Sequence, residues 1–194
     1  RRFFREKFDI DPAPEDFFPF FGAGEHGFFE GVAAKYGLEL DFEADRLRIY
    51  QHYRDAIGDP VPNIHGEGMT VGPMDALPGA REIVGLATEA GLRLAVATSA
   101  SLLKADITLV QIGLPPEVFD IVITAEDVAQ NKPNPEIFER AAERLGVEPH
   151  ECLVIEDSLN GVRAGRAAGM TVIAVATAGV SEGALRSAGA SYVA

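Results

Sequence analysis

Three features are scarce in this sequence, and each scarcity excludes a class of protein. Cys152 is the single cysteine in 194 residues, so no disulfide can form within the chain, and we expect a buried apolar side chain in a reducing, cytoplasmic setting. No apolar run reaches the roughly 18–20 residues of a membrane span. The opening letters RRFF are followed by charged residues instead of an apolar segment, which argues against a signal peptide.

Positive charge is scarce as well. The chain has 17 Lys and Arg residues against 30 Asp and Glu residues, a formal net charge of −13, whereas a nucleic-acid surface needs clustered basic side chains. We therefore expect no nucleic-acid or membrane partner. A small phosphorylated metabolite is compatible with this charge, because one local lysine and a metal ion can recruit it. The hydrophobic fraction of 47% is sufficient for a substantial core. Separately, we expect the protein to be a monomer.

Residues 1–76 have a helical pattern, and we predict a separate helical domain without strands there. Its crowded phenylalanines are typical of a small helical core rather than of a cofactor-binding cluster. A glycine- and proline-rich stretch from residue 58 to residue 79 is expected to be a connector. The predicted helices lie at 3–8, from Pro14 onward, at 28–36 and at 42–57.

Residues 77–194 alternate between helical and strand patterns. Such alternation predicts an α/β fold, with a parallel sheet that is covered by helices on both faces. The predicted helices lie at 80–90, 102–112, 135–145, 160–168 and 182–188. The predicted strands lie at 92–97, 121–124, 153–155, 171–175 and 191–193.

The stretch CLVIEDSLNGVRAGRAAG, residues 152–169, combines a short apolar strand with two acids, Glu156 and Asp157. Open α/β sheets bind ligands at the carboxyl ends of their strands. Adjacent carboxylates repel each other unless a proton or a cation neutralises them, and oxygen ligands of this kind suit Mg²⁺. The alternative is an ordinary strand end with two solvated acids.

Polar residues also follow two other predicted strands. Thr98 and Ser99 lie before a helix, where free N–H groups favour an anion, although both are also common helix caps. Lys132 lies in a proline-rich turn, either as a fixed positive charge in the site or as a surface lysine. Hydroxyl donors, a cation and paired acids at the strand ends of one sheet are what a phosphoryl group requires. The combination therefore predicts a phosphoryl-transfer site.

Three strings resemble the motifs of a known superfamily. VATSAS, NKPNPEIF and VIEDSLNGVRAGRAAGM are similar to the second, third and fourth motifs of the haloacid dehalogenase (HAD) superfamily. The resemblance extends from about residue 77 to the C-terminus and implies a HAD-like Rossmannoid core. The segment before it resembles the small helical cap of the β-phosphoglucomutase-like branch.

The resemblance implies a role for each matched residue. Thr98 and the N–H of Ser99 would bind phosphoryl oxygens, and Lys132 would neutralise the nucleophile and the phosphoryl group. Asp157, with Glu156 beside it, would hold Mg²⁺. The remaining residues assigned to substrate binding are Ala100, Asn131, Glu25 and His26.

One motif of the family is missing. In the family a DxD motif supplies an aspartate nucleophile, on a strand between those of the second and fourth motifs, and a second aspartate as general acid and base. Asp9-Ile10-Asp11 has the letters but not the preceding strand. We therefore expect that the motif lies upstream of Arg1, in a longer enzyme.

The resulting expectation is an Mg²⁺-dependent phosphatase of a small phosphorylated metabolite, acting through an aspartyl-phosphate. A sugar-phosphate mutase is the first alternative, although Glu25 occupies the position of the cap arginine that grips a second phosphate in such enzymes. A 2-haloacid dehalogenase, which needs no metal, is a second alternative. An inactive fragment or a non-catalytic binding module is a third.

Overall fold

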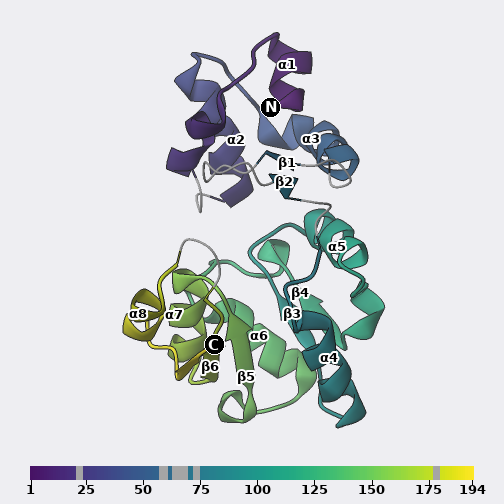
Figure 1. The fold of residues 1–194 in the computed structure, drawn as a ribbon, viewed down its shortest axis with the longest axis vertical. Coiled ribbons are helices and arrows are strands. Elements are labelled where there is room, and N and C mark those ends of the chain that lie inside the picture. The colour runs from purple at the N-terminus through teal and green to yellow at the C-terminus, as the bar shows by residue number, and fades with distance from the viewer. Residues whose placement is uncertain (21–23, 57–60, 63–69, 72–74, 177–179) are drawn as a thin grey trace. The chain divides into compact units, whose positions relative to one another are not determined.

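The computed structural model describes residues 1–20, 24–56, 61–62, 70–71, 75–176 and 180–194 (Figure 1). The chain divides into two compact units. The first comprises Arg1–Pro78 with Asp106–Gly113, and the second comprises Gly79–Ala105 with Leu114–Ala194. Most of the predicted connector, including 63–69, lies outside the described residues. None of the described helices is long and apolar enough to cross a membrane.

The first unit is helical, as the sequence predicts. Among its described residues, the departure from this prediction is a pair of two-residue antiparallel strands, β1 (Val61–Pro62) and β2 (Thr70–Val71), in a region that we predicted to have no strands. Their sequence has no alternating pattern long enough to indicate a strand. The helices are α1 (Arg2–Phe8), the 3₁₀ helix η1 (Pro14–Phe20), α2 (Gly24–Lys35) and α3 (Phe42–Ala56).

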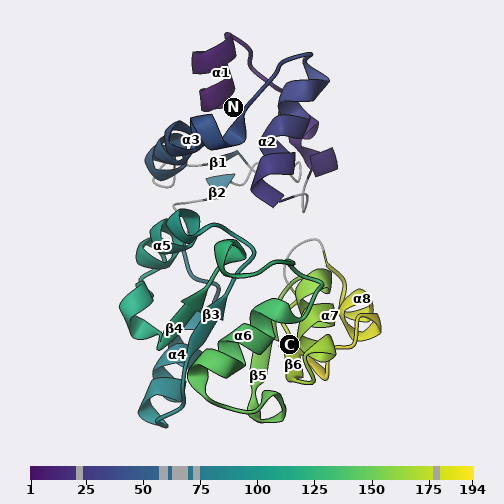
Figure 2. The same cartoon turned by 180° about the vertical axis from the view of Figure 1, so that it is seen from behind.

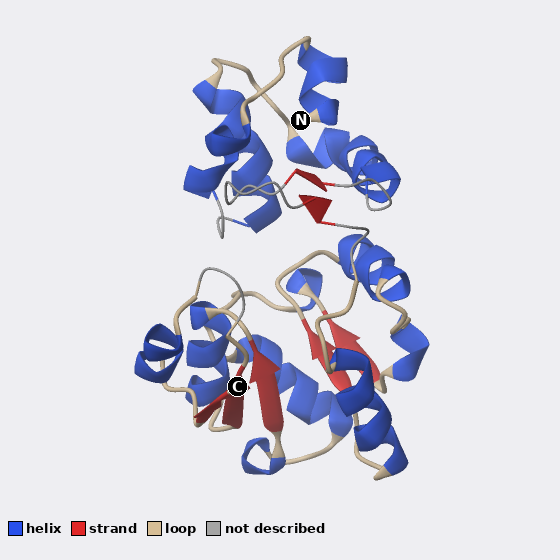
Figure 3. Cartoon of the chain, viewed as in Figure 1, coloured by secondary structure: helices blue, strands red, loops and turns tan. Residues whose placement is uncertain are grey.

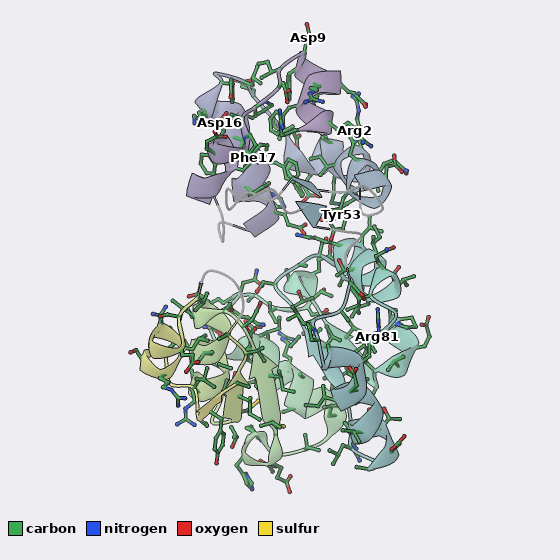
Figure 4. The ribbon with its side chains drawn as sticks, in the orientation of Figure 1. Arg2, Asp9, Asp16, Phe17, Tyr53 and Arg81 are labelled. Atoms are coloured by element: carbon green, nitrogen blue, oxygen red, sulfur yellow. The ribbon has the colours of Figure 1, made fainter. Side chains whose placement is uncertain are left out.

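Phenylalanine rings form the core of this unit. Phe4 is fully buried, and its ring centroid lies 6.1 Å from that of Phe17 and 6.3 Å from that of Phe29. Beside the rings, the buried carboxylate of Asp16 accepts hydrogen bonds from Lys35, Tyr36 and the Ala13 amide. Figure 4 labels Asp16 and Phe17 on η1. The aromatic residues of this segment therefore serve packing, as predicted.

The second unit is an α/β structure whose described strands form two parallel sheets (Figure 3). The first sheet pairs β3 (Ala95–Ala97) with β4 (Ile121–Ile123), and the second has the order β5 (Leu153–Glu156), β6 (Thr171–Ala174), β7 (Tyr192–Val193). The helices that alternate with these strands along the chain are α4 (Ala80–Glu89), α5 (Leu102–Gln111), α6 (Glu136–Leu145), α7 (Leu159–Ala167) and α8 (Glu182–Ser187). Of these, α5 is divided, because its residues from Asp106 onward belong to the first unit. Short 3₁₀ helices are η2 (Pro116–Val118), η3 (Ala125–Asp127) and η4 (Pro149–Glu151). Each predicted helix and strand of this half is present, within a few residues at its ends.

The core of this unit lies between α6, α7 and the strands. Ile137 of α6 and Val162 of α7 are fully buried in it, together with Ile123 and Val172 of the strands. Figure 2 shows α6 crossing the strands in the view from behind. A side chain at Gly165 would lie 2.9 Å from Val172, so glycine is what lets α7 pack closely against β6.

One face of β5 is uncovered, although its apolar sequence is typical of a buried strand. Leu153 is 54% exposed and Ile155 is 46% exposed. The reason is topological, because among the described strands β5 pairs only with β6, and β3 pairs only with β4. Helix α4 likewise has no buried residue, although it is amphipathic. Cys152, which we predicted to be buried, is only half-buried at the start of the same strand.

Candidate functional site

The carboxyl end of β3 continues into the turn that carries Thr98. The Thr98 amide donates to the Ile123 carbonyl at 2.9 Å, which extends the ladder between β3 and β4 by one bond. The Thr98 hydroxyl accepts from the Ala100 amide at 3.1 Å, and the Ala100 carbonyl accepts from the Ala125 amide at 3.0 Å. Thr98 and Ala100 are half-buried and Ser99 is exposed. The turn is therefore fixed on both sides, immediately before α5.

The carboxyl end of β4 leads into a loop whose backbone amides donate hydrogen bonds to two carboxylates. Asp127 accepts from the amide and hydroxyl of Thr124, and the bond from that amide is the main cause that lowers the pKa of Asp127. Glu136, on the first turn of α6, accepts from the amides of Ala129 and Gln130, which lower the pKa of its carboxyl group. Lys132 lies between these anchored amides and α6.

Lys132 connects two strand ends. Its Nζ donates to the Ala97 carbonyl, the last residue of β3, at 3.0 Å. The same Nζ forms an ion pair with Glu156, the last residue of β5, and lies 4.7 Å from the centroid of the Phe138 ring. The side chains of Lys132 and Glu156 are only 11% and 9% exposed. A buried positive charge therefore lies at the carboxyl ends of both sheets.

Glu156 is enclosed by donors. Its Oε1 receives Lys132, and its Oε2 accepts from the amides of Asp157 and Ser158, at 3.0 and 2.9 Å, and from the Ser158 hydroxyl at 2.9 Å. Burial by itself raises the pKa of Glu156, but the charge and hydrogen bond of Lys132, with the bonds from Ser158, outweigh burial and lower that pKa. Glu156 is therefore ionised at neutral pH.

Of the two adjacent acids Glu156 and Asp157, only one is placed to bind a magnesium ion directly. Among the described residues, no group of three or more His, Cys, Asp or Glu side chains could hold a metal ion. Mg²⁺ commonly keeps several waters and takes only one or two carboxylates. Asp157 is exposed at the strand end, whereas both oxygens of Glu156 already accept hydrogen bonds within the chain. Asp157 is therefore the better candidate for a direct ligand, with Glu156 behind it.

Of the other predicted site residues, two lie in the first unit and one is next to Lys132 in the chain. Glu25 and His26 belong to the first unit, where the Glu25 carboxylate accepts from the Tyr50 hydroxyl. The imidazole of His26 packs against the Phe42 ring at 4.5 Å, and its Nε2 lies 2.9 Å from a carboxylate oxygen of the neighbouring helix. Asn131 is exposed beside Lys132 in the second unit.

Sequence reasoning missed two residues that shape the site. Glu136 anchors the loop of Lys132, and Gly161 makes room for Glu156, because a side chain at Gly161 would lie 1.9 Å from the Glu156 carboxyl carbon. An acid in the first turn of a helix, four residues after the lysine, was the available signal for Glu136. The small residues around Gly161 indicate only that a helix packs closely there.

A family model for haloacid dehalogenase-like hydrolases matches residues 2–169. The chain belongs to this family. The motif resemblance and the α/β fold with a helical N-terminal region are thereby confirmed. A solved structure with a similar fold is that of a putative β-phosphoglucomutase from Thermotoga maritima, with a TM-score of 0.75 and 24% identity. That likeness covers 100% of this chain and 83% of the other.

Relatives within the family include named phosphatases. Hexitol phosphatase A of Escherichia coli is 42% identical over 112 residues, which are 57% of this chain and 50% of that protein. Protein CbbY of Cereibacter sphaeroides is 36% identical over 139 residues, 65% of this chain and 60% of the relative. SUPPRESSOR OF QUENCHING 1 of Arabidopsis thaliana is 38% identical over 185 residues, 95% of this chain but 16% of that protein. The chain thus spans less than two thirds of each of these relatives.

Proposed function

We propose that these residues form the cap and most of the core of an Mg²⁺-dependent phosphatase that hydrolyses a small phosphorylated metabolite. The observation that carries the proposal is the position of Lys132, whose ammonium group binds the ends of β3 and β5 at once. A lysine held there offsets the charge of a phosphate ester bound beside Thr98. The single cysteine supports a reducing, cytoplasmic setting.

The residues of the chain bind and orient the ester. The Thr98 hydroxyl and the Ser99 amide donate to phosphoryl oxygens, at the start of α5, where the helix dipole favours an anion. Asp157, with Glu156 behind it, is proposed to hold Mg²⁺, which when bound supplies further positive charge beside those oxygens. Lys132 and the donors thereby hold the phosphorus in place for attack.

The nucleophile is proposed to be an aspartate outside these 194 residues. Asp9-Ile10-Asp11 does not supply it, because Asp9 ends α1 in a left-handed conformation and Asp11 pairs with Arg1 and Arg5. Beyond their single partners, β3 and β5 are unpaired among the described strands, and the apolar side chains of β5 are uncovered. A further parallel strand between β3 and β5 would satisfy both edges and deliver a carboxylate to the site of Lys132.

The proposed reaction has two steps. The aspartate carboxylate attacks phosphorus, and the bond from phosphorus to the leaving oxygen breaks. A general acid donates a proton to that oxygen. Water then attacks the aspartyl-phosphate, its proton passes to the same group acting as base, and phosphate and free aspartate are released. Residues 1–76 are proposed to act as the cap that excludes bulk water and selects the substrate.

A phosphatase is favoured over a mutase by the acid at Glu25. Its half-buried side chain accepts a hydrogen bond from the Tyr50 hydroxyl, at the position where the mutases are expected to carry an arginine for the second phosphate. A carboxylate there repels a second phosphate. Hexitol phosphatase A of Escherichia coli, the relative named above, supports the same preference.

The experiment is a turnover assay on the natural polypeptide that contains these residues. Mg²⁺-dependent release of phosphate from p-nitrophenyl phosphate and from a panel of metabolite phosphates is expected, with loss of activity in Lys132→Ala and Asp157→Asn. Conversion of β-glucose 1-phosphate to glucose 6-phosphate would contradict the phosphatase proposal and indicate a mutase. Release of halide without metal would indicate a dehalogenase, and the absence of all turnover would favour a non-catalytic module.

A further inference from the structure

The segment 128–135, which carries Lys132, contains no helix or strand. The Asn134 amide donates to the Asn131 carbonyl at 3.1 Å, and the rest of the segment is held by side-chain hydrogen bonds. Glu136 supplies most of them, since its Oε2 accepts from the Ala129 amide at 3.1 Å and from the Gln130 amide at 2.9 Å, while its Oε1 also lies 3.0 Å from the Ala129 amide. The Asn134 side chain closes the other half of the loop, because it donates to the Gln130 side chain and accepts from the Glu136 amide, each at 3.0 Å.

Glu136 can fix this loop because it lies on a rigid support. It begins α6, and the next two residues, Ile137 and Phe138, are buried in the core of the second unit. Phe138 also lies under the Lys132 ammonium group, 4.7 Å from Nζ to the ring centroid. Helix α6 thus contacts the Lys132 loop at two points. Glu136 binds the backbone before Lys132, and the Phe138 ring lies against the ammonium group of Lys132. Arg140, one turn further along α6, pairs with Glu136 at 3.1 Å and keeps its carboxylate oriented.

We infer that Glu136 is a positioning residue for Lys132. By binding the Ala129 and Gln130 amides, it sets the direction from which the Lys132 side chain reaches the Ala97 carbonyl and Glu156. Without these bonds the loop opens, and Lys132 leaves the strand ends for part of the time. The inference gives a function to an acid that contacts neither the proposed substrate nor the proposed metal, and its role in turnover rests on the proposed phosphatase function.

The position of Lys132 can be measured without any enzymatic activity. The chain has four lysines, at positions 7, 35, 104 and 132, so acylation by a dilute anhydride followed by peptide mass spectrometry reports each separately. Lys132 is expected to react slowly, because its side chain is 11% exposed and ion-paired. The variants are Glu136→Ala, which removes both acceptors, and Glu136→Gln, which keeps one neutral acceptor. Glu139→Ala is the matched control, since Glu139 is an exposed acid on the same turn of α6.

Glu136→Ala is expected to raise the acylation rate of Lys132 by roughly tenfold, because a hydrogen bond to a charged group is worth about that factor in an opening equilibrium. Glu136→Gln should give a smaller increase, and the control should match the wild type, as should the other three lysines. Hydrogen exchange at Ala129 and Gln130 should accelerate in the same order. The inference fails if the exchange accelerates while the Lys132 rate stays at the wild-type value, since Glu136 then only folds the loop.

An activity measurement separates this inference from the proposed function. In an active polypeptide, Glu136→Ala should lower kcat more than it raises KM, and Glu136→Gln should recover part of the loss. If no phosphatase activity exists, the labelling result still stands or falls by itself. If the activity exists but neither variant changes kcat or the Lys132 rate, the positioning role is wrong and the phosphatase is unaffected. A general loss of the fold in Glu136→Ala would show as faster acylation of Lys104 too, and the glutamine variant then decides.

Discussion

The carboxylate of Glu156 lies directly against the backbone of Gly161, so that a side chain at Gly161 would place its first carbon 1.9 Å from the carboxyl carbon. Gly161 is the third residue of α7, and its amide donates to the Ser158 hydroxyl at 2.9 Å. The start of α7 thus accommodates the acid that holds Lys132. A glycine inside a helix ordinarily costs stability, and here it is required by the site.

This contact predicts an unusual result for a glycine-to-alanine change. Gly161→Ala should lower the free energy of unfolding by about 1–3 kcal/mol, because Glu156 is held by four donors and cannot move away without losing them. Gly85→Ala is the matched control, since Gly85 lies in α4 with nothing within 4 Å of an added carbon, and it should raise the free energy of unfolding by about 0.5–1 kcal/mol. Urea unfolding measures both. Equal stabilisation by the two changes would contradict the close contact.

The Lys132–Glu156 pair predicts strong coupling. Lys132→Met should lower the free energy of unfolding by about 3–5 kcal/mol, because it leaves a buried carboxylate without its partner. Adding Glu156→Gln should recover part of the loss, since the unpaired charge is then gone. A double-mutant cycle by chemical denaturation measures the coupling energy. Additive effects of the two changes would mean that the pair is solvated.

The same pair predicts how stability depends on pH. The pKa of Glu156 is lowered from its ordinary value of 4.5, so the unfolded chain takes up this proton at a higher pH than the folded chain. The stabilising contribution of Glu156 is therefore complete above about pH 4.5 and is lost as the pH falls through the lowered pKa. Glu156→Gln should flatten the fall in stability below that pH, whereas Glu143→Gln, at an exposed position of α6, should not. The test is urea unfolding at pH values from 6 down to about 3.

Asp16 predicts separate responses of the two units. Its carboxylate accepts hydrogen bonds from Lys35 and Tyr36. Both bonds lower the pKa of Asp16, and the bond from Lys35 has the larger effect. Asp16→Asn should accelerate hydrogen exchange throughout the helices of residues 1–56, and Tyr36→Phe, which removes one donor, should have a smaller effect. Exchange in β4, α6 and α7 should remain unchanged. Acceleration in those elements as well would indicate that the two units unfold together.

Local patterns were sufficient for most of the fold. The alternation of apolar strands with amphipathic helices predicted the described α-helices and strands of residues 77–194, because helix and strand periods are local properties of the chain. The short 3₁₀ helices η2, η3 and η4 were not predicted. The motif strings also led to Lys132 and Glu156, and the structure brings these two side chains together at the strand ends. Every catalytic, substrate-binding or metal-binding role assigned to a residue of the chain remains a prediction.

The sequence by itself therefore determined the order of elements, the family, and the strand ends at which chemistry is expected. Only the tertiary structure decided that Lys132 binds both strand ends and that both carboxylate oxygens of Glu156 accept hydrogen bonds from the chain. It also decided that β3 and β5 belong to separate sheets. The physical reason is distance along the chain. Hydrophobic periods and helix ends are set by residues within a few positions of one another, whereas the contacts of Lys132 join residues 24 and 35 positions away, and such contacts exist only once the helices have packed on the strands.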